Sequence, residues 1–150
     1  MFLKKRSEDR DGENVAETLI SVVDDDESVR DSTELLLRSA GYNVATFESG
    51  ELFLHSETLS ETECLVVDIR MPGMDGLELQ DRLILLDAGV PIIFVTAQDD
   101  MRTRQLAMDG GACDVFQKPF VASAFLTAIR AALEAPPGGI GPVTKRGCNA

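Results

Sequence analysis

Residues 19–27 of the chain read LISVVDDDE, an apolar and largely β-branched run that ends in four consecutive acids. The apolar part, residues 19–23, has the composition of a buried strand. Carboxylates crowded at one end of such a strand repel one another and lower the stability of the fold. The stretch therefore predicts a strand whose carboxyl end carries a site that holds these acids together.

Strand-like runs recur along the chain at 43–47, 64–67, 91–95 and 113–116. Helical patterns lie between them, and Gly41 is expected to end the first helix. Weaker helical patterns lie near 49–57 and 100–109. Three helices have clear apolar faces. The face of the first helix comprises Val29, Leu36, Leu37 and Ala40. That of the helix at 75–87 comprises Leu79, Leu83 and Leu86, and that of the helix at 121–134 comprises Val121, Phe125, Ala128 and Ala132. Five strands alternating with five helices predict an α/β domain with a doubly wound parallel sheet, covered on both sides.

Polar residues follow the predicted strands where an open parallel sheet binds ligands, beyond the carboxyl ends. Asp24 and Asp25 follow the first strand, Asp68 the third, Thr96 the fourth and Lys118 the fifth. In a flavodoxin-like sheet of order 2-1-3-4-5, the first and third strands are neighbours, so their acids converge on one pocket. Carboxylates with no base among them favour a hard divalent cation, Mg²⁺ above all, with Mn²⁺ as a substitute.

Without a metal ion, the crowded carboxylates are expected to raise one another's pKa values in the folded state. A raised carboxylate pKa means that the native state holds protons more tightly than the unfolded chain does. The metal-free domain should therefore lose stability as the pH rises through that range.

Composition bounds the class of protein. The chain has 150 residues, is 44% hydrophobic and carries a net charge of -12, which disfavours direct nucleic-acid binding by this chain. No apolar run is long enough to span a membrane, and no apolar segment of a secretory signal follows the basic first residues. The three cysteines form no spacing pattern, and an odd count suits a reducing compartment. We therefore expect a cytoplasmic protein without membrane contact.

Composition also predicts the domain boundaries. Residues 1–17 are polar and mixed in charge without periodicity, which is typical of a disordered leader. Residues 18–134 contain all the predicted strands and helices. Residues 135–150 begin with a run rich in Pro and Gly, which is typical of a flexible tail or a truncated linker.

Four segments at the ends of strands, considered together, resemble the receiver domain of two-component response regulators. They are residues 23–27 (VDDDE), 67–76 (VDIRMPGMDG), 95–97 (VTA) and 117–120 (QKPF). Each segment alone is a weak signal, whereas all four in the family's order and spacing are specific. The similarity covers about residues 18–134. In detail the chain is most similar to receivers that precede LuxR-type helix-turn-helix output domains, notably in the Arg two places after Asp68.

The resemblance implies a phosphoacceptor that catalyses only its own phosphorylation and slow dephosphorylation. Asp68 would be the nucleophile that accepts phosphoryl from a histidine kinase or a histidine phosphotransfer protein. Lys118 would pair with a phosphoryl oxygen as a compact charge, and the Thr96 hydroxyl would donate to another. The Lys118–Pro119 bond is expected to be cis.

The resemblance also implies the metal ligands. Asp24, Asp25 and Asp68 would supply carboxylate oxygens to Mg²⁺, and the backbone carbonyl of Arg70 would complete the set of protein ligands. The side chains of Arg70 and Gln98 would flank the path of the hydrolytic water and set the lifetime of the phosphate.

One position departs from the family's pattern. The place three residues before Lys118, usually an aromatic that moves inward on phosphorylation, is Val115. A β-branched side chain has no ring to rotate. We therefore expect switching to depend on Thr96 and on the surface around the helix near 100–109, with homodimer formation on phosphorylation as one outcome. The downstream protein partner, the kinase and the signal are not indicated by the sequence.

Three alternatives share parts of this pattern. Residues 24–28 (DDDES) also match the D-x-D-x-[ST] motif of haloacid-dehalogenase-like phosphatases, but that class does not account for residues 71–76. An EF-hand loop is excluded because its sixth and twelfth places are Val29 and Leu35 rather than Gly and Glu. A receiver-like adaptor that works without phosphorylation remains open, although Asp68, Thr96 and Lys118 are all present.

Overall fold

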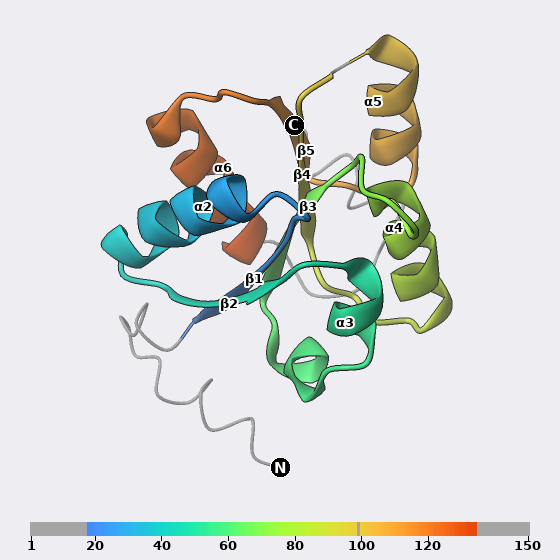
Figure 1. Cartoon of the computed structure of the whole chain (residues 1–150), viewed down its shortest axis with the longest axis horizontal. Coiled ribbons are helices and arrows are strands. Elements are labelled where there is room, and N and C mark those ends of the chain that lie inside the picture. The colour runs from blue at the N-terminus through green and yellow to red at the C-terminus, as the bar shows by residue number, and fades with distance from the viewer. Residues whose placement is uncertain (1–17, 99, 135–150) are drawn as a thin grey trace.

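A computed structural model describes residues 18–98 and 100–134 of the chain (Figure 1). The predicted leader (1–17) and the predicted tail or linker (135–150) lie outside the described residues. In chain order the elements are β1 (Leu19–Val23), α2 (Glu27–Ser39), β2 (Asn43–Phe47), α3 (Gly50–Leu54), the 3-10 helix η2 (Glu57–Glu61), β3 (Cys64–Asp68), α4 (Gly76–Leu85), β4 (Ile92–Thr96), α5 (Met101–Asp109), β5 (Asp114–Gln117) and α6 (Ala122–Glu134).

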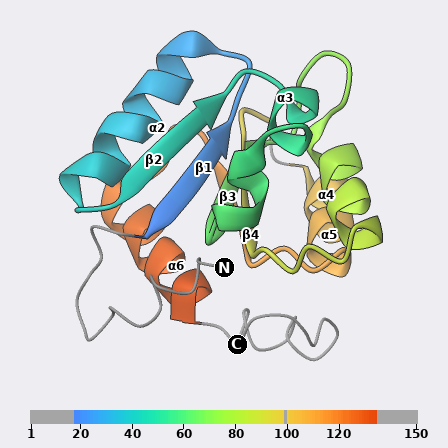
Figure 2. The same ribbon diagram turned by 90° about the horizontal axis from the view of Figure 1, so that it is seen from below.

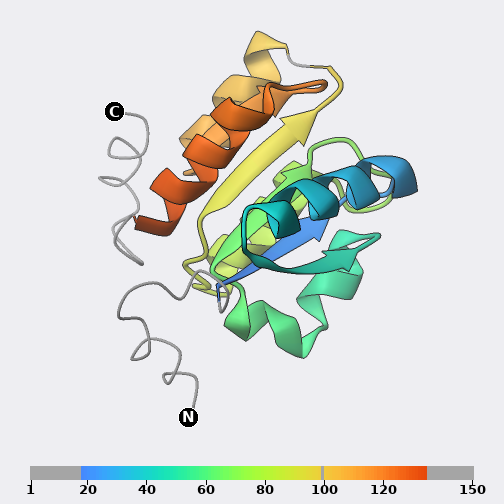
Figure 3. The same ribbon diagram turned by 90° about the vertical axis from the view of Figure 1, so that its left-hand side faces the viewer.

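The five strands form one sheet in the order β2-β1-β3-β4-β5, and every neighbouring pair is parallel. This is the fold class that the sequence predicts. Helices α2 and α6 cover one face of the sheet, and α3, α4 and α5 cover the other (Figures 1 and 3). The strand order places the carboxyl ends of β1 and β3 side by side, which brings together the residues that follow them.

Two apolar layers hold the helices on the sheet. The layer under α2 and α6 contains Leu37, Phe125 and Ile129, all fully buried against alternate residues of the strands. The layer under α3, α4 and α5 contains Phe53 and Leu79, which pack against the strand residues whose side chains point to the other face of the sheet. Burial on both faces explains why β3 and β4 are apolar up to their last residue instead of alternating.

The ends of the helices follow local signals in the sequence. Asp26 caps α2, because its carboxylate accepts from the backbone N–H groups of Ser28 and Val29. Gly41 follows this helix with a positive φ of 98°, as expected of a residue that ends a helix. Asp75 and Glu78 form a reciprocal capping box at the start of α4.

Three residues assigned to buried helix faces are not buried. Leu86 is 58% exposed because α4 ends at Leu85 and the chain turns through Asp87, whose φ is 57°. Val121 is 66% exposed because it precedes the first residue of α6. Ala40 is exposed at the C-cap of α2. In each case the apolar period continues past the end of the helix, where it no longer faces the core.

Within residues 18–98 and 100–134, no helix combines the length and the apolar character needed to cross a membrane.

Candidate functional site

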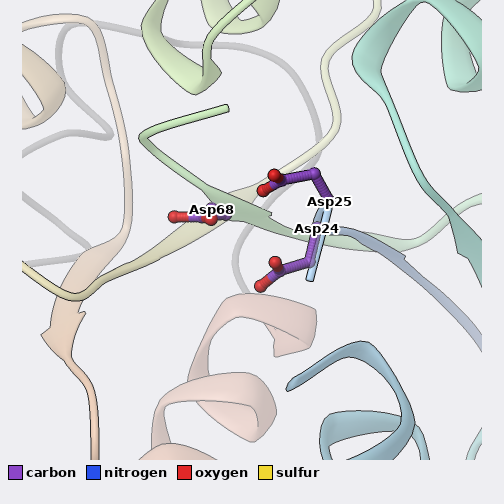
Figure 4. Close-up of side chains that lie close together, drawn as sticks. All are labelled: Asp24, Asp25 and Asp68. Atoms are coloured by element: carbon purple, nitrogen blue, oxygen red, sulfur yellow. The ribbon is translucent and has the colours of Figure 1, made fainter. Parts of the chain in front are cut away.

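Three carboxylates meet at the carboxyl edge of the sheet. Asp24 and Asp25 follow the end of β1, and Asp68 is the last residue of β3 (Figure 4). One oxygen from each can be chosen so that all three lie within 4.8 Å of one another. Asp24 and Asp68 are buried, at 1% and 6% exposure, whereas Asp25 is exposed. The strand order therefore brings together the three acids that the sequence assigns to one pocket.

Asp24 is held rigidly from several sides. Its backbone N–H donates to the Phe47 carbonyl of β2 at 3.1 Å, and its own carbonyl accepts from Arg30 Nη1 of α2 at 2.8 Å. Its Oδ1 accepts from the Asp26 backbone N–H at 2.9 Å. Its Oδ2 lies 3.2 Å from Lys118 Nζ. Both carboxylate oxygens thus have donors, which fixes the orientation of this buried side chain.

Lys118 lies among the acids, which corrects the expectation of a carboxylate cluster without a base. Its Nζ is 3.2 Å from Asp24 Oδ2 and 3.6 Å from Asp68 Oδ2, and its side chain is only 16% exposed. Its backbone N–H donates to the Thr96 carbonyl at 2.8 Å, and the Lys118–Pro119 bond is cis, as expected. In this state the ammonium partly compensates the repulsion between the acids.

The pKa of Asp68 is raised to about 6. Burial of the carboxylate is the largest cause, and the charge of Asp24 is the second. Lys118 and the backbone N–H of Arg70, which donates to Asp68 Oδ1 at 3.2 Å, act in the opposite direction. The expected increase is present at Asp68, but it comes from desolvation first and from like charge second.

Gly76 allows α4 to begin directly against the end of β3. A Cβ at this position would lie 2.6 Å from the Asp68 carbonyl oxygen and 2.9 Å from the Ile69 Cα. Its backbone N–H donates to the Ile69 carbonyl at 2.8 Å. The absence of a side chain at this position thus allows the Asp68 backbone to lie directly against the start of α4.

Thr96 and Gln98 are linked through the backbone of the loop after β4. The Thr96 hydroxyl donates to the Gln98 carbonyl at 3.1 Å and accepts from the Gln98 N–H at 3.2 Å. Thr96 is fully buried, whereas Gln98 is exposed. The hydroxyl is therefore engaged within its own loop.

Arg70 makes a contact that the sequence does not indicate. Its Nη2 lies 3.4 Å from Asp100 Oδ2, and the two side chains are 50% and 54% exposed. Asp100 is the N-cap of α5, and its Oδ1 accepts from the Thr103 N–H at 2.8 Å, which lowers the pKa of Asp100. The ion pair thus joins the loop after β3 to the start of α5.

Val115 is 3% exposed and packs in the layer on the α5 side of the sheet. Phe116, its neighbour, packs on the opposite side, with its ring centroid 5.7 Å from that of Phe125 and 6.0 Å from that of Phe120. Phe116 therefore does not replace the missing aromatic, because its ring faces α6.

Comparison with known proteins identifies the family. The family model described as the response regulator receiver domain matches residues 20–130, which include the three acids, Thr96 and Lys118. The chain belongs to the response regulator receiver domain family. The family recognised in the sequence is thereby confirmed, and this receiver is a domain of two-component signalling. Membership also decides against the haloacid-dehalogenase alternative.

Relatives support the same assignment. The response regulator protein TodT of Pseudomonas putida is 40% identical over 120 residues, which are 80% of this chain and 53% of TodT. Nodulation protein W of Bradyrhizobium diazoefficiens is 42% identical over 116 residues, which are 77% of this chain and 51% of that protein. The receiver thus spans about half the length of the curated relatives that it matches.

Solved structures agree with the fold. The crystal structure of FixJ-N is similar with a TM-score of 0.74 and 34% identity, and the match covers 82% of this receiver and 98% of that chain. The response regulator StyR is similar with a TM-score of 0.73 and 44% identity, over 79% of this receiver and 60% of that chain.

Proposed function

We propose that this receiver accepts a phosphoryl group on Asp68 in a Mg²⁺-dependent reaction. The donor would be the phosphohistidine of a histidine kinase or of a histidine phosphotransfer protein. The observation that carries the proposal is the buried Asp68 carboxylate, which lies beside two further carboxylates and within 3.6 Å of Lys118 Nζ. Membership in the receiver family supports it.

The residues present fit a hard divalent ion. Asp24, Asp25 and Asp68 offer oxygens within 4.8 Å of one another, and the exposure of Asp25 leaves an open side for the waters that Mg²⁺ retains. The backbone carbonyl of Arg70 would be a further oxygen ligand. Mn²⁺ would substitute for Mg²⁺ at such a set of oxygens. A bound ion would neutralise charge on the acids and on the transferring phosphoryl oxygens.

The side chains have separate roles in the proposed reaction. An Asp68 oxygen forms the new O–P bond while the P–N bond to the donor histidine breaks, and the imidazole leaves. Lys118 is close enough to move from the carboxylates to a phosphoryl oxygen. The Thr96 hydroxyl would exchange its bond to the Gln98 carbonyl for one to another phosphoryl oxygen. With a pKa of about 6, Asp68 is mostly ionised at neutral pH and can act as the nucleophile.

The consequence of phosphorylation would be a change in protein contacts rather than turnover of a small substrate. Arg70 and Gln98 would set how long the phosphate lasts. With Val115 in place of an aromatic, switching would depend on Thr96 and on the surface of α5, where phosphorylation would favour a homodimer or another protein partner. Direct binding of nucleic acid by this chain is disfavoured by its net charge of -12.

The test is labelling with a phosphohistidine donor or with acetyl phosphate in the presence of Mg²⁺. We expect one acid-labile phosphate per chain, lost in Asp68→Asn and retained in the control Asp81→Asn, which changes an exposed acid of α4. Label that persists at full stoichiometry in Asp68→Asn would refute the assignment. Absence of label in the unmodified chain would favour the phosphorylation-independent adaptor.

A further inference from the structure

Helix α5 is attached to the domain with little apolar burial. Ala107 is its one fully buried residue and Met108 packs partly buried against the core, whereas Met101 and Leu106 are 84% and 48% exposed. By comparison, α4 buries Leu79 and Leu83. A buried alanine offers much less apolar area than a leucine, so polar contacts must contribute to the position of α5.

Gln80 of α4 supplies such a contact at the C-terminal end of α5. Its side chain is buried, with 3% of the residue exposed, and its Nε2 donates to the Ala107 carbonyl at 3.0 Å. This oxygen is one of the last four carbonyls of the helix, which lack partners in a regular α-helix. It also accepts from the Ala112 N–H at 3.1 Å. Gln80 therefore caps α5 from the neighbouring helix, and the two helices run side by side (Figures 1 and 2).

Gly110 shows how closely the Gln80 amide packs. A Cβ at this position would lie 2.5 Å from Gln80 Oε1, 2.7 Å from Cδ and 2.9 Å from Nε2. The φ of Gly110 is -80°, a value that every residue adopts. The close approach at Gly110 is therefore to the Gln80 side chain, and the backbone conformation does not call for a glycine.

The N-terminal end of α5 is held in a different way. Its N-cap residue Asp100 contacts Arg70 at 3.4 Å through side chains that are about half exposed, and such pairs contribute little to stability. Between the two ends, Arg104 Nη2 donates to the Val115 carbonyl of β5 at 3.0 Å. One end of the helix is thus held by a buried hydrogen bond and close packing, and the other by an exposed ion pair.

We propose that Gln80 is the positioning residue that fixes the C-terminal end of α5. Rearrangement at the Asp68 site would then move the N-terminal end of α5, near Asp100, about this fixed end. The first part of the proposal concerns the folded domain alone. The second part rests on the proposed function, because it requires a change of state at Asp68.

A double-mutant cycle between Gln80→Ala and Gly110→Ala tests the contact. Gly110→Ala alone should lower the melting temperature, because the added methyl displaces a buried amide. In the Gln80→Ala background the same change should be neutral or raise the melting temperature, because alanine restricts the unfolded chain at a φ that it adopts without strain. An equal effect of Gly110→Ala in both backgrounds would overturn the contact. Gln105→Ala in place of Gln80→Ala is the control, since its side chain bonds within α5, to Asp109 at 2.8 Å.

Amide hydrogen exchange tests the fixed end. In the metal-free receiver, Gln80→Leu should speed exchange of the Ala112 amide about tenfold, while Gln105→Leu leaves it unchanged. With Mg²⁺ and beryllofluoride as the phosphoryl mimic, the unmodified chain should change exchange at Arg104 but not at Ala112. In Gln80→Leu, the change in exchange caused by beryllofluoride should extend to Ala112. A general loss of stability alone does not produce this spread of the response along the helix.

The outcomes separate the two parts of the proposal. If the Ala112 amide exchanges at the same rate in metal-free Gln80→Leu as in the unmodified chain, Gln80 does not fix the C-terminal end of α5. Equal changes at Arg104 and Ala112 in the unmodified chain with beryllofluoride would overturn movement about it. Absence of any change with beryllofluoride would overturn the proposed function and the movement, whereas the metal-free comparison would still support the role of Gln80.

Discussion

Lys118 forms a buried ion pair with Asp24, its Nζ 3.2 Å from Oδ2, with side-chain exposures of 16% and 2%. The same ammonium is 3.6 Å from Asp68. Without a metal, the lysine is thus the cation that holds the acids in place. When all three carboxylates are ionised, the Lys118 ammonium compensates one of their negative charges. The two negative charges that remain match the charge of a divalent ion.

Removal of the ammonium should destabilise the metal-free domain. Lys118→Met keeps the apolar stem but leaves Asp24 buried without its ion pair, and breaking such a pair costs about 3 kcal/mol. Mg²⁺ should recover much of this loss, because it still binds the carboxylates. Denaturant melts with and without Mg²⁺ measure both effects. Equal stability of Lys118→Met and the unmodified chain without Mg²⁺ would contradict the structural role of Lys118.

Asp68 should make stability depend on pH in the opposite direction to a salt-bridged carboxylate. Its folded pKa of about 6 lies above the unfolded value of 3.8, so the native state binds more protons between these values. Stability from this group is therefore present at low pH and lost as the pH rises, by about 3 kcal/mol.

Comparison with Asp68→Asn isolates this contribution from that of the other acids. In the metal-free receiver, the variant should gain stability relative to the unmodified chain as the pH rises from about 4 to about 6.5. Melts across this range give the difference directly. A difference that stays constant with pH would show that the Asp68 pKa is not raised.

Mg²⁺ should stabilise the folded receiver by binding only to it. With a dissociation constant of about 1 mM, a concentration of about 10 mM adds roughly 1.4 kcal/mol. Asp25→Asn should stabilise the metal-free domain by removing one like charge, and should weaken the response to Mg²⁺. Thermal melts at neutral pH measure both, with Asp31→Asn on the exposed side of α2 as the control. If Asp25→Asn is less stable than the unmodified chain without metal and is stabilised by Mg²⁺ to the same extent, the Asp25 carboxylate has a structural role and does not bind the metal.

Substitution of Arg70 or Gln98 should change the lifetime of the phosphate more than the yield of phosphorylation. Both side chains are polar, exposed and two places after a residue of the site. The decay of labelled receiver after removal of the donor gives the lifetime of Arg70→Ala and of Gln98→Ala. Asp100→Ala separates the Arg70 ion pair from the Arg70 side chain itself. Unchanged decay in both Arg70→Ala and Gln98→Ala would remove these residues from this role.

Phosphorylation should favour association of the receiver with a protein partner through the surface of α5. Met101 and Leu106 are already 84% and 48% exposed there, and a homodimer would cover them. Sedimentation with and without beryllofluoride should show a dimer only with the mimic, and Met101→Asp should abolish it. Monomers in both states at high concentration would count against the homodimer and favour another partner.

The fold could be predicted because its signals are local and strong. The strands β3 and β4 are apolar runs that end at a polar residue, Asp68 or Thr96, which marks the carboxyl edge of the sheet. The ends of the helices were harder to predict, because the apolar periodicity includes Leu86 and Val121, which lie just outside α4 and α6.

The partners within the site were less predictable, because they depend on side chains far apart in the sequence. Lys118 and Asp24 are 94 positions apart, and strand order alone places both at the same edge without indicating that they pair. Gln80 gave no signal at all: a polar residue in an amphipathic helix is normally assigned to its solvent face. Only the position of α5 shows that this amide is buried.

Gly76 has a consequence for how this receiver can be damaged. The position carries no charge and donates only a backbone hydrogen bond, yet one methyl group there would collide with the Asp68 carbonyl and the Ile69 Cα. Both are main-chain atoms, which cannot swing aside as a flexible side chain does. A single added carbon atom at residue 76 would thus inactivate the site by steric clash, although every acidic and basic group would still be present. A search for inactivating substitutions that is confined to ionisable residues would overlook this position.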